Sequence, residues 1–339
     1  MSQSVDVRPF VPLDLPLVHR LSPMGISLDS LTTLTRGNHM VENAVWASVP
    51  LADLGTPTYV LRVGEGGYVA QFRHKAGEQH AHIVFIAPSL HAEGDADSWL
   101  RLIEAMIVAA GKRGAVTLNA EVAESDASFE VLRRAGFAVY ARQTIWRRDP
   151  QPLPTRTPEL LRLPSERDAV ALNSLYLESV PRLLRQACQP PELRGALVFG
   201  RGSRLAAHIT AYEGKCGIYL NVIMNPDDCQ PRAADLLADA LSHLPRADRL
   251  PIYINVRRHQ EWLTSALERL HFVPQGNQAF MVRHTACRIE QPARSTQTIE
   301  GAVLAMPHRH EFYYQPQAEF AIECEKALPL DGTSHYGRS

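Results

Sequence analysis

The sequence of 339 residues is poor in cysteine and contains no long apolar run. Its five cysteines are odd in number and form no CxxC pair, so we expect reduced thiols and neither a disulfide framework nor a zinc site. They are Cys188, Cys216, Cys229, Cys287 and Cys324. No stretch approaches the roughly 20 apolar residues that a helix needs to span a bilayer.

The sequence also lacks an excess of charge of either sign. The chain holds 35 Lys and Arg against 36 Asp and Glu, a formal net charge of −1, so neither a nucleic-acid-binding nor a membrane-binding surface is indicated. Residues 1–10 contain no basic stretch followed by an apolar core, and we therefore expect no secretory leader. Together these absences predict a cytoplasmic protein.

What is present suffices for two hydrophobic cores. The length gives a prior of about two domains, and an apolar fraction of 45% is ordinary for a globular protein. The stretch DPQPLPTRTPE at 149–159 is rich in proline and charge, which is typical of a linker. The tail at 288–339 has no sustained period, so we expect an extended, irregular segment.

The stretch from Val116 to Arg148 predicts a strand, a helix and a second strand. Apolar and polar residues alternate over its first part, as in a strand. Ser125 or Asp126 can cap the helix that follows, and Gly136 stands just after it, where a left-handed residue is needed.

The same signals return near the end of the chain. Ile252–Val256 is strand-like, Glu261–Leu270 is an amphipathic helix, and His271-Phe272 stands in the place of Gly136-Phe137. Phe272 follows Phe137 by 135 positions. Because this offset stays nearly constant over some thirty residues, it indicates an internal duplication.

Each half gives the same predicted order of strand, two helices, three strands, helix, strand, helix and two strands. This mixture predicts an α/β fold of the α+β kind with a mixed sheet. The predicted domains are residues 1–148 and 160–287, with the linker at 149–159 and the tail at 288–339.

This order, with a helix that ends in Gly-Phe, resembles the GNAT superfamily of N-acetyltransferases as two tandem copies over about residues 1–285. The most specific carriers are FEVLRRAGFAVYARQTIWRR in the first copy and WLTSALERLHFVPQGNQAFMV in the second. The resemblance implies a splayed sheet with helices on both faces and acetyl-CoA in the V where the fourth and fifth strands part. Its pyrophosphate would rest on backbone amides at the start of the third helix.

Both copies depart from the family's phosphate loop, which has an Arg or Gln followed by two glycines. The first copy has Gly94 but places Asp95 and Asp97 where the phosphates would lie, and these acids would cap the helix and repel an anion. The second copy, NPDDCQPRAADLL, is a partial match and the better candidate for the cofactor. Its candidate residues are Gln230, Arg232, Ala233 and Ala234.

Other family positions are altered as well. The tyrosine that often acts as general acid one turn before Gly-Phe is replaced by Leu132 and Leu267. The asparagine that often opens this helix is replaced by Ser125 and Gln260, and Gln260 joins the cofactor-binding candidates. Glu121, at the end of a strand, is the candidate general base.

Three further groups have open interpretations. Arg257-Arg258-His259 could meet a CoA phosphate or an acidic substrate, or could form a solvated loop. The pairs His80-Ala81-His82 and His308-Arg309-His310 could ligate a metal, but no partner stands at a recognised spacing, so we expect surface histidines and no metal. Cys229 is a candidate nucleophile without an activating partner.

Two functions stay open at this point. The first is an acyl-CoA-dependent N-acyltransferase that modifies an amine of a small molecule or peptide. The second is a catalytically degenerate GNAT fold that serves as a binding or scaffolding protein, with residues 288–339 mediating homo-oligomerisation or contact with a protein partner. The family resemblance favours the first, and the altered loops favour the second.

Overall fold

A computed structural model of the protein describes residues 7–37, 56–64, 66–152, 159–201 and 204–285. The chain divides into two compact units, Met1–Arg288 and Ile289–Ser339, and the second lies outside the described residues. The predicted tail and most of the predicted linker therefore fall outside as well. Within the first unit, the N-terminal half runs to residue 152 and the C-terminal half begins at residue 159.

The N-terminal half contains strands and helices in nearly the predicted order, except that a short strand lies between the first two helices and one strand, not two, ends the half. They are β1 (Val7–Pro9), α1 (Leu15–Leu21), β2 (Ile26–Ser27), α2 (Ser30–Arg36), β3 (Thr58–Val63), β4 (Gly66–Arg73), β5 (His80–Ala87), α4 (Ala96–Lys112), β6 (Thr117–Val122), α5 (Ala127–Arg134) and β7 (Ala138–Arg148).

The C-terminal half repeats most of this order. Its elements are α6 (Ala169–Ser179), α7 (Arg182–Arg185), β8 (Ala196–Arg201), β9 (Arg204–Glu213), β10 (Ile218–Met224), α8 (Pro226–Cys229), α9 (Ala233–Ser242), β11 (Ile252–Arg257), α10 (Thr264–Arg269) and β12 (Val273–His284). Short 3-10 turns precede α6, α9 and α10 at Glu166–Asp168, Gln230–Arg232 and Arg258–Leu263.

One mixed sheet joins the strands of both halves. Its order is β1-β3-β4-β5-β6-β12-β7-β11-β10-β9-β8, and β2 pairs with β5 beside this path. The pairs β5–β6 and β10–β11 are parallel, and their neighbours in the sheet are antiparallel. The predicted α/β class with a mixed sheet is thus confirmed.

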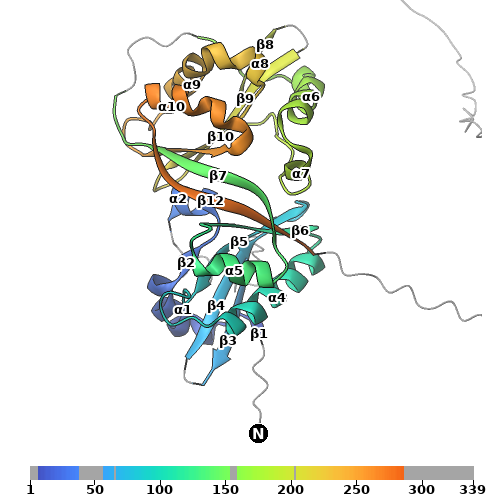
Figure 1. The fold of residues 1–339 in the computed structure, drawn as a ribbon, viewed down its shortest axis with the longest axis vertical. Helices are drawn as coiled ribbons and strands as arrows, with labels where there is room; N and C mark the ends of the chain where they lie inside the picture. Colours follow the sequence, from blue (N-terminus) through green and yellow to red (C-terminus); the bar gives the residue numbers. More distant parts are fainter. Residues whose placement is uncertain (1–6, 38–55, 65, 153–158, 202–203, 286–339) are drawn as a thin grey trace, which may run out of the picture. The chain divides into compact units, whose positions relative to one another are not determined.

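The two halves exchange their last strands (Figure 1). β12 enters the N-terminal half and lies between β6 and β7, with Met281 opposite Ala120. β7 enters the C-terminal half and lies between β12 and β11, with Ile254 opposite Trp146. Each half therefore obtains an internal strand of its sheet from the other.

This exchange corrects the predicted pair of strands at the end of each half. Each half ends in one long strand, of 11 residues in β7 and 12 residues in β12. A second strand is not needed, because the long strand of the other half takes its place in the sheet.

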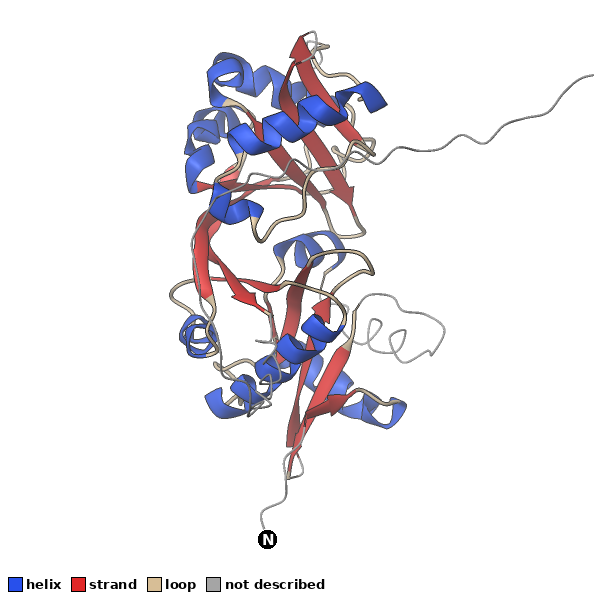
Figure 2. Cartoon of the chain, turned by 90° about the vertical axis from the view of Figure 1, so that its right-hand side faces the viewer, coloured by secondary structure: helices blue, strands red, loops and turns tan. Residues whose placement is uncertain are grey.

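Helices cover both faces of the sheet in each half, as the resemblance implies (Figure 2). In the N-terminal half, α4 and α5 pack on one face around the fully buried Trp99, and α1 packs on the other through Val18. In the C-terminal half, α9 and α10 pack on one face, and α6 and α7 on the other. No helix in the described ranges is long and apolar enough to cross a membrane.

An equivalent salt bridge near the start of each half is further evidence of the duplication. Arg8 binds Asp14 through both terminal nitrogens at 2.7 and 2.8 Å, and Asp14 accepts the Val11 amide at 3.1 Å. Arg162 binds Asp168 in the same way at 2.8 and 2.7 Å. The spacing Arg-x5-Asp is visible in the sequence and marks the start of both copies.

The caps of α5 and α10 confirm that His271 stands in the place of Gly136. Both residues have a positive φ, 82° for Gly136 and 62° for His271. The amide of Phe137 donates to the Leu132 carbonyl at 3.0 Å, and that of Phe272 donates to Leu267 at 3.0 Å. This left-handed cap is strained for a residue that carries a Cβ.

We expect His271→Gly to raise the free energy of unfolding by about 1 kcal/mol, because glycine adopts the left-handed conformation without steric cost. Urea unfolding measures the change. Gly136→Ala is the matched reverse substitution and should destabilise, since its Cβ would also approach Arg283 within 3.2 Å. Equal stability of wild type and His271→Gly would contradict the strain.

The strand exchange predicts that neither half folds alone. A chain of residues 1–152 lacks both β12 and β11, so β6 would expose an unpaired edge and β7 would have no partner strand, and we expect it to aggregate. Produced together with residues 159–288, it should form a soluble complex that elutes as one species in gel filtration. Residues 1–288 are the control. If residues 1–152 alone unfolded cooperatively at the melting temperature of residues 1–288, the prediction would be wrong.

Candidate functional site

The sheet opens once in each half, between two parallel strands. β5 and β6 pair over three positions, His80–His82 with Thr117–Asn119, and then part. β10 and β11 likewise pair over Ile218–Leu220 with Ile252–Ile254 before they part. Beyond these pairs the facing backbone amides and carbonyls must find other partners.

In the N-terminal half, the protein's own main chain fills the opening. The Leu28 amide donates to the Val84 carbonyl of β5 at 3.0 Å, and the Glu121 amide of β6 donates to the Leu28 carbonyl at 2.8 Å. Leu28 is fully buried, and the preceding β2 pairs with Ile86 and Phe85. This segment serves as a short strand that closes the V, and nothing in the sequence pattern distinguished it.

Glu121, the base expected from the sequence, lies beside this closed opening. Its side chain points inward and accepts the Ser30 amide at 2.8 Å, at the first turn of α2. Only 8% of the residue is exposed. The carboxylate therefore caps a helix, and its part in proton transfer stays a prediction.

The start of α4 also carries an internal anion. Asp95 accepts the amides of Asp97 and Ser98 at 3.0 Å each, as expected for a cap. The Tyr68 hydroxyl donates to the same carboxylate at 2.5 Å. Despite an opposing effect of burial, these hydrogen bonds lower the pKa of Asp95 to about 2. A carboxylate thus occupies the place that a phosphate would need.

In the C-terminal half, a side chain spans the opening instead. Gln260 donates from Nε2 to the Val222 carbonyl of β10 at 2.8 Å and accepts the Arg257 amide of β11 at 3.3 Å. Val222 lies two positions beyond the last paired residue of its strand, as Val84 does in β5. The side-chain amide of Gln260 therefore stands where the main-chain amide of Leu28 stands in the other half.

The other cofactor candidates lie at the start of α9. The amide of Ala233 already donates to the Gln230 carbonyl, because the 3-10 turn Gln230–Arg232 runs directly into the helix. Ala233 and Ala234 are buried, whereas Gln230 is exposed. The structure places Gln260 separately, at the opening of the sheet.

Arg232 lies over a cleft of about 230 Å³ that is lined also by Phe199, Arg204 and Asp228. Its guanidinium stacks 5.4 Å above the Phe199 ring, and its Nε is buried without a hydrogen-bond partner in the described part of the chain. Arg204 approaches Asp228 at 3.4 Å. Two arginines, Arg204 and Arg232, therefore line the cleft beside the start of α9.

Cys229 is not a suitable nucleophile. Its thiol is buried and donates to the Ala206 carbonyl at 3.2 Å. Burial and then the nearby Asp228 carboxylate raise the pKa of Cys229 to about 12, so the reactive thiolate is not formed at neutral pH.

The first histidine pair does not lie on the surface as expected. His80 is buried and shares a hydrogen bond with Thr117 at 2.8 Å, whereas His82 is half-buried and lies 3.8 Å from Asp29, which Arg73 binds at 2.8 Å. Burial lowers the pKa of His82 to about 3. The second pair lies outside the described residues, and within those residues no cluster of three His, Cys, Asp or Glu side chains could hold a metal ion.

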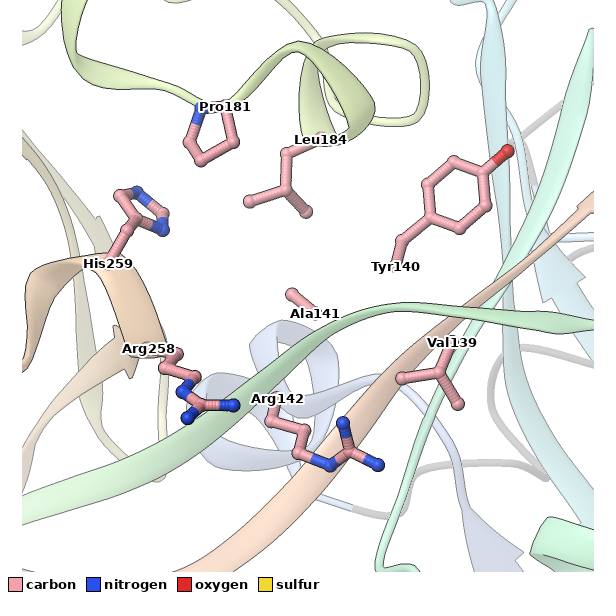
Figure 3. A pocket seen from close by; sticks show the side chains of 8 residues that line it. All are labelled: Val139, Tyr140, Ala141, Arg142, Pro181, Leu184, Arg258 and His259. Carbon is pink, nitrogen blue, oxygen red and sulfur yellow. The ribbon is translucent and has the colours of Figure 1, made fainter.

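A larger cleft of about 400 Å³ combines both halves of the chain (Figure 3). One wall is the exchanged strand β7, and the facing walls come from α7 and from the turn after β11. The lining residues are Val139, Tyr140, Ala141, Arg142, Pro181, Leu184, Arg258 and His259. Sequence reasoning singled out Arg258 and His259 but missed β7, because the exchange leaves no local signal.

The imidazole of His259 faces into this cleft, across from Pro181 and Leu184 (Figure 3). Burial, followed by the positive charge of Arg257, lowers the pKa of His259 to about 4. At neutral pH the ring is therefore unprotonated and can accept a hydrogen bond, although so low a pKa makes it a weak base.

Comparison with solved structures identifies the fold. The chain is similar to a GCN5-related N-acetyltransferase from Sphaerobacter thermophilus, with 14% identity, a TM-score of 0.52, and coverage of 82% of this chain and 95% of that one. At this identity the likeness shows the fold alone, and that fold is the GNAT fold.

Two further solved structures are similar over most of the chain. One is a putative acetyltransferase from Pyrococcus horikoshii, with 11% identity, a TM-score of 0.48, and coverage of 84% of this chain and 90% of that one. The other is a tandem GNAT protein from the clavulanic acid biosynthesis pathway, with 14% identity, a TM-score of 0.49, and coverage of 83% and 99%. The sequence matches no protein-family model and no curated protein.

We expect the ring of His259 to titrate with a midpoint near pH 4, against 6.5 for an ordinary histidine. NMR titration of the imidazole protons measures this midpoint. Arg257→Gln should raise it, because one of the two causes of the shift is removed, whereas the remote Arg249→Gln should leave it unchanged. A wild-type midpoint near 6.5 would show that the ring is neither buried nor close to the charge of Arg257 in solution.

Proposed function

We propose that the chain is an acyl-CoA-dependent N-acyltransferase, which transfers an acetyl group to an amine, with one cofactor site in its C-terminal half. The difference between the two openings carries this proposal. Among the described residues, the side chain of Gln260 spans the opening between β10 and β11, whereas main chain closes the opening between β5 and β6. A side chain can rotate away, but the Leu28 segment could leave only by disrupting the core.

Two arginines are proposed to hold the phosphates of the cofactor. Within the described ranges, the buried Nε of Arg232 has no hydrogen-bond partner, and Arg204 makes contacts of 3.4 and 3.5 Å to Asp228 and Glu178. The glycine loop is missing and the Ala233 amide is engaged, so charge would take over the role that backbone amides have elsewhere. The exposed side chain of Gln230 and the amide of Ala234 complete the proposed site.

The residues at the opening are suited to acyl transfer. Acetyl-CoA, when bound, supplies the acyl group as a reactive thioester. Rotation of Gln260 would free the Arg257 amide, a backbone donor of the kind that stabilises an oxyanion. The unprotonated His259 in the adjoining cleft can accept a hydrogen bond from the amine, while the proton that the amine loses as its nitrogen–carbon bond forms passes to solvent water, because a ring with a pKa of about 4 is a weak base. We therefore propose that His259 orients the amine, and the general base that the sequence suggested at Glu121 stays a prediction.

A catalytically degenerate binding protein is the second candidate function, because of the helix starts in both halves. Asp95 caps α4, and the Ala233 amide of α9 is engaged, so neither helix start offers the usual phosphate cradle. On this alternative the protein binds no acyl-CoA, and its tail at 288–339 would mediate contacts with a partner.

Isothermal titration of acetyl-CoA into the full chain separates the two candidates. We expect a stoichiometry near one. Arg232→Glu should raise Kd about tenfold or more, because a hydrogen bond to a charged group contributes about 1.5–3 kcal/mol. Arg249→Glu, at an exposed arginine that follows the far end of α9, is the matched control. A flat trace at millimolar acetyl-CoA would favour the degenerate binding protein, and a stoichiometry of two would contradict the closed N-terminal opening.

A further inference from the structure

The cleft beside the opening lies on the opposite face of the sheet from α9. Its wall residues Tyr140, Ala141 and Leu184 belong to the cluster that packs α6 and α7 against the sheet. The start of α9 belongs to the cluster on the other face, together with Val222 and Val256. A ligand in this cleft therefore does not share the position of the cofactor phosphates proposed at Arg232.

Several arginines lie in or beside the elements that form this cleft. Arg258 lines it, and α7, which forms one wall, carries Arg182 and Arg185. Arg257 lies behind it, stacked 5.4 Å over the Phe280 ring. None of these four arginines has a carboxylate within salt-bridge distance in the described ranges, and the Nε atoms of Arg185 and Arg257 are buried without hydrogen-bond partners there.

The acidic groups nearby do not balance this charge. Glu124 is committed to Arg142, which it binds through two hydrogen bonds at 2.8 and 3.1 Å. Glu121 accepts the Ser30 amide and acts on Arg257 through space, so it offsets part of the charge of Arg257 and leaves Arg258 and the arginines of α7 without a carboxylate partner in the described ranges. In a chain with a net charge of −1, such a local excess of arginine needs an explanation.

We propose that the cleft binds an acyl acceptor that carries a carboxylate or phosphate group beside its reacting amine, with Arg258 as the residue that recognises the anion. The identification of the bound acid as the acceptor rests on the proposed function. The anion site itself rests on the arginines and on the cleft.

The chemistry of the acceptor agrees with this charge. An amine enters as an ammonium ion, which the unpaired arginines would repel, unless the same molecule brings a negative group to offset them. Arginine forms paired hydrogen bonds with carboxylates and phosphates, which fixes the orientation of the rest of the ligand. A volume of about 400 Å³ admits a small molecule of this kind.

Direct binding tests the anion site without any acyl-CoA. The probes are L-glutamate for the carboxylate, O-phosphoethanolamine for the phosphate, and putrescine as a purely cationic amine of similar size. Each is titrated into the full chain by calorimetry, and the ring protons of His259 are followed by NMR to locate binding. The stronger of the two anionic probes identifies the anion.

We expect at least one anionic probe to bind and to shift the His259 signals, and putrescine to bind neither detectably nor at this site. Arg258→Gln should weaken the anionic probe about tenfold, since one charged hydrogen-bond partner is lost. Arg249→Gln is the matched control and should leave the affinity unchanged. Because both arginines are exposed, neither substitution should disturb folding, and thermal melts of the two variants against the wild type check this.

Other outcomes overturn the inference. They are no binding of either anionic probe at tens of millimolar, binding that Arg258→Gln does not weaken, or putrescine binding at least as tight. If acetyl-CoA also binds, CoA release should be faster with an anionic amine than with putrescine, and the reverse order would contradict the acceptor assignment. Anion binding with a flat acetyl-CoA trace would remove the proposed function and leave the anion site.

Discussion

The antiparallel pairing of β7 with β12 is the constraint on which the rest of the structure depends. It runs from Val273 opposite Arg147 to Val282 opposite Ala138 and joins two copies that would otherwise each lack an internal strand. Because of it, the sheet continues without a break from one half to the other. The same pairing brings β7 to the cleft beside β11, so a wall of the C-terminal site consists of N-terminal residues.

The two openings show how one fold acquires two different capacities. In both, an amide group joins the parting strands at equivalent positions, Val84 and Val222. The N-terminal amide belongs to Leu28, and removal of such a fully buried side chain from a core costs about 2–5 kcal/mol. Moving Gln260 costs only its hydrogen bonds, about 1 kcal/mol each. Burial, and not the shape of the sheet, therefore distinguishes the closed opening from the opening at which we propose that the cofactor binds.

Local signals in the sequence predicted the elements, and long-range pairing escaped them. The helix stop at Gly136 and its counterpart at His271 could be found because the cap has a fixed chemistry. A run such as Ala138–Arg148 has the same alternation whether it folds back on its own copy or crosses to the other. Gln260 was found by its position in the repeat, but the role of Leu28 depends on contacts with residues far along the chain.

The exchange also has a consequence for the order in which the chain can fold during synthesis. β6 and β7 leave the ribosome early, yet their common neighbour β12 is made only after roughly 130 further residues, which takes roughly 7–25 s at ordinary rates of translation. Until β11 and β12 are made, the nascent N-terminal half presents an open edge at β6 and a strand β7 without a partner. We therefore expect the nascent chain to bind chaperones that cover exposed strands until β12 has been synthesised.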